Sequence, residues 1–271
     1  MQSGIGKDSD GEIKMYGAII GDIVGSRFEW DNIKSKEFEF FDRNCFFTDD
    51  SVMTIAVAKA LHESKKNGYE DLDEQLDRWM HEIGKRYPHC GYGGRFYSWM
   101  MKDEHEPYNS FGNGSAMRVS ECGTIAESLE EALWLAENSA AITHDHPEGI
   151  KGAQATAACI FLAKEGKDMD EIRKYAEDNF YRLDFTIDEI RPTYSFNETC
   201  QGTVPQAIEC FLESGSYADA IRNAISIGGD SDTLAAITGG MAEAYYGLED
   251  EMIETANTYL DDYLKSVIRS L

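Results

Sequence analysis

The stretch Gly228-Gly229-Asp230-Ser231-Asp232-Thr233 leads directly into residues 234–242, an apolar run of small side chains with the length of a helix. The same arrangement occurs earlier in the chain, where Phe47-Thr48-Asp49-Asp50-Ser51 leads into the apolar run 52–61. Asp, Ser and Thr are the preferred N-cap residues of helices. Each stretch therefore predicts the capped start of a helix.

Both stretches carry more oxygen ligands than a helix cap requires, because a cap needs only one side-chain oxygen. Grouped carboxylates repel one another unless a cation offsets their charge. Carboxylate and hydroxyl oxygens without His or Cys favour Mg²⁺, Mn²⁺ or Ca²⁺ over zinc. The pair of stretches therefore indicates a shared metal centre, with two capped helices as the simpler alternative. The candidate ligands are Thr48, Asp49, Asp50, Asp230, Asp232 and Thr233.

A calcium-binding EF-hand loop is excluded as the explanation of the second stretch. Counted from Asp230, the sixth and twelfth positions hold Ala235 and Met241, whereas the EF-hand needs Gly and Glu there. The glycines at 228 and 229 allow a tight backbone turn that brings the following side chains together.

The length of 271 residues fits one large domain or two small ones, and 42% of the residues are hydrophobic. Long segments rich in Ala, Glu, Leu and Ile dominate, and alternating apolar runs are rare, so we expect an all-α fold. No internal repeat or linker is visible. We therefore expect a flexible tail over residues 1–14 and a single compact multi-helix domain over residues 15–271.

Several further helices follow from apolar spacing and capping residues. Glycines at 17, 21 and 25 lie four residues apart, so they would form one face of a helix over 16–26 and let a neighbouring helix approach closely. The segment 86–96 reads as a loop and 184–202 as irregular. The other predicted helices are 72–83, 128–141, 148–164, 168–179, 205–214, 217–226 and 249–271.

The formal net charge is −25, from 50 acidic and 25 basic residues, which argues against binding to nucleic acid or to an anionic membrane. Six cysteines show no metal-binding spacing and are typical of reduced thiols. No signal peptide is visible, and the apolar segment 15–24 is too short to span a membrane. We expect a cytoplasmic protein, and a monomer is the favoured oligomeric state.

Three further features allow a functional or a purely structural interpretation. The Gly-, Asn- and Ser-rich segment 108–118 can present backbone N–H groups to an anion, although turns share its composition. The pair His144 and His146 suggests a zinc site, but no third ligand is near in sequence. A hydrogen bond from one of these His residues to a ligand stays open. Glu29, in a loop between helices, is either a surface carboxylate or a movable acid or base.

Five ordered motifs resemble the ADP-ribosylglycohydrolase family, which includes the glycohydrolase that reactivates dinitrogenase reductase. They span most of the chain, from about residue 15 to residue 247. The motifs are Gly21-Asp22-x-x-Gly25-Ser26 with Glu29, Thr48-Asp49-Asp50-Ser51, Gly112-Asn113-Gly114-Ser115-Ala116-Met117-Arg118, Thr143-His144, and Gly228-Gly229-Asp230-Ser231-Asp232-Thr233.

The resemblance implies an all-α fold with a binuclear Mg²⁺ or Mn²⁺ centre beneath a cleft for ADP-ribose. By motif match, the six candidate ligands named above would hold the two ions, and Glu29 would lie near the scissile ribose. The expected catalytic residues are Glu29, Asp50 and Asp232. The expected ligand-binding residues are Ser110, Phe111, Gly112, Asn113 and His144.

The implied activity is metal-dependent hydrolysis of the N- or O-glycosidic bond between ADP-ribose and a protein side chain or small acceptor. Family members that cleave ADP-ribosyl-arginine carry an acidic residue in the loop that here reads His89-Cys90-Gly91-Tyr92-Gly93-Gly94-Arg95. This loop contains no Asp or Glu, which counts against arginine specificity, and serine-linked, small-molecule and nucleobase-linked ADP-ribose stay open. The alternatives are an inert ADP-ribose-binding or structural protein of the same fold and a two-metal phosphoesterase.

Overall fold

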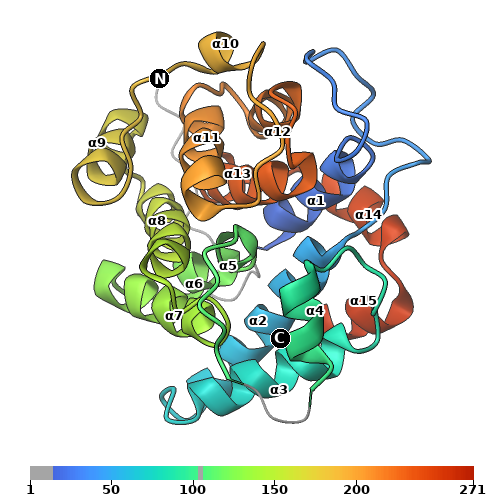
Figure 1. Cartoon of the computed structure of the whole chain (residues 1–271), viewed down its shortest axis with the longest axis vertical. Helices are drawn as coiled ribbons and strands as arrows, with labels where there is room; N and C mark the ends of the chain where they lie inside the picture. Colours follow the sequence, from blue (N-terminus) through green and yellow to red (C-terminus); the bar gives the residue numbers. More distant parts are fainter. Residues whose placement is uncertain (1–14, 103–105) are drawn as a thin grey trace.

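The computed structural model describes residues 15–102 and 106–271, and the predicted tail over residues 1–14 lies outside them. The described residues form helices and no strand, apart from one isolated bridge between Gly112 and Thr199, so the all-α prediction is confirmed (Figure 1). The helices are α1 (Tyr16–Ser26), α2 (Asp49–Lys65), α3 (Leu72–Gly84), α4 (Gly94–Met100), α5 (Gly114–Met117), α6 (Ser120–Ile125), α7 (Leu129–Ala141), α8 (Pro147–Lys164), α9 (Met169–Asn179), α10 (Ile187–Ile190), α11 (Cys200–Leu212), α12 (Tyr217–Ser226), α13 (Ser231–Tyr246), α14 (Asp250–Tyr259) and α15 (Asp262–Ile268).

Helix α13 lies at the centre of the fold, with α1, α8, α11 and α12 packed against it (Figure 1). Residues 231–243 of this helix are all buried. Apart from Asp232 and Glu243, these residues have small or apolar side chains, as expected of a segment without a solvent-facing side. The second acidic stretch therefore starts a helix that is enclosed from Ser231 to Glu243.

Helix α1 packs against α13 with backbone touching backbone. A Cβ atom added at Gly25 would lie 2.6 Å from the Cα of Asp232. A Cβ at Gly21 would collide with the backbone of Ala235, and one at Gly17 with the carbonyl oxygen of Gly239. The glycine face predicted from the sequence is thus the contact that holds α1 on α13.

Helix α4 begins inside the expected loop 86–96, and the segment 184–202, expected to be irregular, contains α10. Two further boundaries also differ from the sequence-based expectation. Helix α11 begins at Cys200 rather than at Pro205, because the Thr199 side chain caps it by accepting from the N–H of Gly202. The expected continuous helix over 249–271 is wrong, since α14 ends at Tyr259 and α15 starts after Asp261, whose carboxylate accepts from the N–H of Leu264 at 2.9 Å.

Two structural features bear on the predicted membrane and redox environment of the chain. No helix in residues 15–102 and 106–271 has the length and apolarity needed to cross a membrane. All six cysteines are unpaired, and five of them are buried.

Replacing Gly21 with Ala is expected to destabilise the fold by about 3 kcal/mol, because the new methyl group meets rigid backbone of α13 rather than a movable side chain. Urea unfolding measures the change. Gly94→Ala is the matched control, since a Cβ there meets no atom within 4 Å, and it should change the free energy of unfolding by less than about 1 kcal/mol. Equal effects of the two substitutions would contradict the close contact.

Candidate active site

The starts of α2 and α13 meet beside α1, so the two acidic stretches come together. Gly228 and Gly229 precede α13 with φ angles of +68° and +81°, a left-handed conformation that glycine adopts without strain. Thr48 caps α2 by accepting from the N–H of Asp50 at 3.3 Å. Both predicted helix starts are therefore confirmed, but only the first is capped by a side chain, since the Asp230 side chain makes no capping hydrogen bond with the first turn of α13. The acids of both starts meet at the same place.

Asp22, on the buried interior of α1, joins this group and was not among the predicted ligands. Its carboxylate accepts from the N–H and the hydroxyl of Thr48, at 2.9 and 2.7 Å. It also accepts from the N–H of Ser51 at 3.0 Å and from the Ser51 hydroxyl. Asp22 therefore ties α1 to the first turn of α2. Its signals in the sequence are its place in the motif Gly21-Asp22-x-x-Gly25-Ser26 and its position as one acid inside an apolar, glycine-rich helix.

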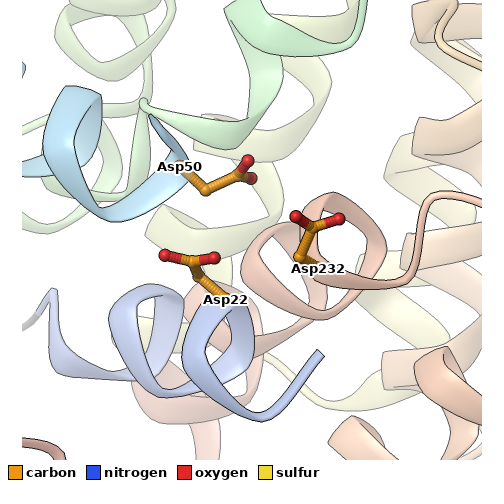
Figure 2. Close-up of side chains that lie close together, drawn as sticks. All are labelled: Asp22, Asp50 and Asp232. Carbon is orange, nitrogen blue, oxygen red and sulfur yellow. The ribbon is translucent and has the colours of Figure 1, made fainter. Parts of the chain in front are cut away.

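Two groups of three carboxylates result, and they share Asp232. Asp22, Asp50 and Asp232 form the first group, in which the ligand oxygens all lie within 4.8 Å of one another. Figure 2 shows these three carboxylates directed toward one another from α1, α2 and α13. Glu29, Asp230 and Asp232 form the second group by the same criterion. The shared residue joins the two groups into one continuous acidic site.

The electrostatics of this site are those of crowded, desolvated acids. Burial, and then the charges of neighbouring carboxylates, hold the pKa values of Asp50 and Asp232 well above their usual range. Burial raises the pKa of Asp22 to about 6 against its hydrogen bonds. Burial followed by the charge of Asp230 raises the pKa of Glu29 to about 7. Each carboxylate therefore resists ionisation in the bare protein.

The donor set fits hard divalent cations. The buried Asp50 Oδ1 atom has no hydrogen-bond partner in the protein, so a lone-pair donor is left unused inside the cluster. Only oxygen ligands surround it, as Mg²⁺ and Mn²⁺ prefer. A bound cation would offset the repulsion between the carboxylates and would coordinate the unpartnered Asp50 Oδ1 atom.

The structure brings most of the predicted ligands to one cavity wall. Asp49, Asp50, Asp230, Asp232 and Thr233 all line a cavity of about 460 Å³. The hydroxyl of Thr233 donates to Asp50 Oδ2 at 3.2 Å.

Thr48 and Asp49 lie less centrally than the sequence suggested. Thr48 does not line the cavity, and its hydroxyl donates to Asp22. Asp49 belongs to neither carboxylate group, and its Oδ1 atom lies 2.8 Å from the position of a Cβ at Gly91.

The predicted ligand-binding loop lines the same cavity, and its end is held on the start of α11. Asn113 donates its N–H to the Glu198 carbonyl at 2.7 Å, and its side-chain amide donates to Asp230 Oδ2 at 2.7 Å. The N–H of Gly112 donates to the Ser110 hydroxyl at 3.2 Å. These two N–H groups already have acceptors inside the protein, so the loop offers fewer free backbone donors than its composition suggested.

His144 lies beside this loop as a neutral hydrogen-bond donor. Arg118, fully buried, donates to the Thr143 hydroxyl at 2.9 Å, and that hydroxyl lies 2.6 Å from His144 Nδ1. Because the buried hydroxyl needs an acceptor for its own hydrogen, we assign Nδ1 as the acceptor and Nε2 as the protonated nitrogen. Burial, then the charge of Arg118, holds the pKa of His144 well below its usual range.

The Nε2 atom of His144 faces the ligand loop, 3.4 Å from the position of a Cβ at Gly112. Arg95 and Arg118, the two cations lining the cavity, belong to the same region. Arg95 lies 4.8 Å above the Tyr108 ring, which in turn contacts His144 with ring centroids 5.9 Å apart. The cavity therefore has a hydrogen-bond donor and two cations around His144 and Tyr108, and carboxylates around Asp232.

Comparison with known proteins shows the family of this chain. A model of the ADP-ribosylglycohydrolase family matches residues 14–260. This chain belongs to the ADP-ribosylglycohydrolase family. The predicted family and enzyme class, ADP-ribosyl glycohydrolase, are thereby confirmed.

The relatives of this ADP-ribosylglycohydrolase have low sequence identity, but the matches cover most of each chain. ADP-ribosylhydrolase ARH3 of Mus musculus is 27% identical over 87% of this chain and 83% of its own length. ADP-ribosylarginine hydrolase Tri1 of Pseudomonas putida is 24% identical, covering 86% and 70%. ADP-ribosyl-[dinitrogen reductase] glycohydrolase of Rhodospirillum rubrum is 25% identical, covering 75% and 70%.

A solved structure described as an ADP-ribosylglycohydrolase-related protein complex shares the fold. Its TM-score is 0.58 at 20% identity, and the match covers 91% of this chain and 96% of that one.

Substituting His144 by Gln should change how stability depends on pH. In the wild type the folded protein keeps His144 neutral, whereas the unfolded chain takes up a proton below about pH 6.5, so stability falls as the pH falls. The stability of the wild type minus that of His144→Gln should decrease by about 1.4 kcal/mol between pH 7.5 and 5.5. Urea unfolding at both pH values measures it, and a constant difference would mean that His144 takes up a proton as readily in the folded protein as in the unfolded chain.

Proposed function

We propose that this ADP-ribosylglycohydrolase holds two divalent cations, Mg²⁺ or Mn²⁺, and releases ADP-ribose from an acceptor. The observation that carries the proposal is the pair of carboxylate groups that share Asp232 at the wall of the cavity. The first ion would be held by Asp22, Asp50 and Asp232, and the second by Asp230 and Asp232 with Glu29 beside it. Thr48, Asp49 and Thr233 complete the predicted ligand set around these groups.

When bound, the cations supply Lewis acidity for the ribose hydroxyls and lower the pKa of an attacking water. The chain itself positions the substrate. Ser110, Phe111, Gly112, Asn113 and His144 would contact the adenosine diphosphate part, and Arg95 and Arg118 offset its negative charge in an acidic protein. The scissile ribose would then lie over the carboxylates.

Glu29 is the carboxylate best placed to move a proton. It follows α1 in a loop, is half-buried and lines the cavity, whereas Asp50 and Asp232 are almost fully enclosed. We assign Glu29 as the general acid or base for the atom that joins the ribose to the acceptor. Asp50 and Asp232 serve as the catalytic carboxylates of the metal site.

A cytoplasmic location and a monomeric state are kept as proposals. The six unpaired cysteines support a reducing compartment.

Replacement of Asp232 by Asn tests the proposed centre, because this side chain belongs to both carboxylate groups. Release of free ADP-ribose from ADP-ribosylated substrates should fall by at least about a thousandfold, and EDTA should abolish release by the wild type. The Mg²⁺-dependent rise in Tm should also be lost. Without metal, the variant should unfold at a higher temperature than the wild type, since one buried and repelled carboxylate is gone.

Glu254→Gln is the matched control, because it removes an exposed acid from α14 and should leave both activity and the metal response unchanged. Release within tenfold of the wild-type rate by Asp232→Asn would contradict the proposed centre. Products of AMP and ribose phosphate, in place of free ADP-ribose, would show diphosphate cleavage by a phosphoesterase.

A further inference from the structure

Asn32 lies in the loop after α1, three residues beyond Glu29, and its side chain reaches the turn before α13. Its Oδ1 atom accepts from the N–H of Gly229 at 2.8 Å, and its Nδ2 atom donates to the Gly229 carbonyl at 2.9 Å. The same amide donates to the carbonyls of Phe28 at 2.6 Å and Glu29 at 3.1 Å. One side chain therefore bonds both the loop that carries Glu29 and the peptide that precedes Asp230.

This pattern of bonds requires the primary amide of an asparagine. A single short side chain here supplies one acceptor and two N–H donors, so it pairs with both polar groups of Gly229 and still donates to its own loop. An aspartate has no donor, and a serine has only one. Asn32 is exposed, so filling the core does not explain the residue either. Its bonds to the turn do.

Lys34 holds the other end of the same turn. Its ammonium group donates to the carbonyl of Ile227, the residue before Gly228, and to the carbonyl of Tyr194 at 2.6 Å. A Cβ atom added at Gly228 would lie 3.0 Å from Lys34 Nζ and 3.1 Å from Asn32 Oδ1. The two side chains therefore both lie against the turn.

The turn itself does little to fix the direction of Asp230. It consists of Gly228 and Gly229, and glycine has the greatest backbone freedom of any residue. The Asp230 side chain makes no capping hydrogen bond with α13, and its Oδ2 atom accepts from the Asn113 amide of the ligand loop at 2.7 Å. Bonds from neighbouring segments therefore contribute to the position of this carboxylate.

The two carboxylate groups differ in what holds them. Asp22 of the first group accepts from backbone N–H groups at the start of α2, and the backbone of Asp232 packs against α1. Those contacts do not involve Asn32. Glu29 and Asp230 of the second group, by contrast, lie on the two segments that Asn32 joins.

We propose that Asn32 is a positioning residue, which fixes Glu29 and Asp230 relative to each other and thereby sets the affinity of the second cation site. This inference rests on the proposed function of the same site. Removal of a residue that orients metal ligands without touching the ion typically weakens metal binding by about 10- to 100-fold. Asn32 acts through the backbone of two segments, and Lys34 supports it at Ile227. The first cation site is independent of both residues.

The test is a titration of Mn²⁺ into the wild type and into Asn32→Ala, in which electron paramagnetic resonance measures the free Mn²⁺. The wild type should bind two ions. In Asn32→Ala the Kd of one ion should rise by at least about tenfold, and the Kd of the other should change by less than about twofold. Anomalous diffraction from crystals of the variant should place the weakened ion beside Asp230. Asn32→Gln should recover part of the affinity, because it keeps the acceptor and both donors.

Lys34→Met separates positioning from charge. Removal of a positive charge would by itself favour a bound cation, whereas loss of the bond to Ile227 should loosen the turn. We expect weaker binding of the second ion, and tighter binding would contradict the positioning role. Because this variant keeps Asn32, it also carries the test should Asn32→Ala fail to fold.

Asn44→Ala is the matched control, since Asn44 is an exposed asparagine in the same connection between α1 and α2, and its side chain donates to Asp42. It should bind both ions as the wild type does. Equal weakening of both ions in Asn32→Ala, or unchanged binding of both, would overturn the positioning role and leave the proposed binuclear centre standing. A wild type that binds fewer than two ions would contradict the proposed function itself.

Discussion

The contact between α1 and α13 is the constraint on which the active site depends. Because Gly25 of α1 lies against the Cα of Asp232, no side chain separates the two helix backbones there. Asp22, one turn earlier on α1, and Asp232, in the first turn of α13, can therefore direct their carboxylates to one point (Figure 2). A larger residue at any of the three glycines would move α1 outward and separate these acids.

The same closeness makes the bare site costly. Burial and mutual repulsion raise the pKa values of Asp50 and Asp232, although Asp50 accepts a hydrogen bond from the Thr233 hydroxyl. Asp22 accepts from the backbone N–H groups of Thr48 and Ser51, and its pKa is still raised. A ligand that binds only the folded state stabilises it by mass action, so a divalent cation would recover part of this cost. The packed apolar helices hold these carboxylates close together and away from water. This arrangement lowers the stability of the metal-free protein, and it also provides the affinity for a cation.

Much of this arrangement could be predicted from the sequence because its signals are local. The cap at Thr48, the start of α13 after Asp230, the glycine face of α1 and the burial of α13 all follow from neighbouring residues. Asp22 was missed because its partners, Thr48 and Ser51, lie on another helix, and one acid in an apolar run does not reveal them. The pairing of Asn32 with Gly229 depends on tertiary contact in the same way.

The boundary errors concern local caps. Helix α11 starts at Cys200 behind the Thr199 cap, and the bridge between Gly112 and Thr199 adds a tertiary contact that no local pattern encodes. The break before α15 did have a local signal, the cap at Asp261, which the acidic composition of the segment obscured.

The most direct test of the account is anomalous diffraction from crystals of the protein loaded with Mn²⁺. We predict two manganese peaks, one beside Asp22 and Asp50 and one beside Asp230, with Asp232 as a ligand common to both. A single peak, or ions bound only at exposed acids away from Asp232, would contradict the central claim that the two helix starts build one binuclear centre.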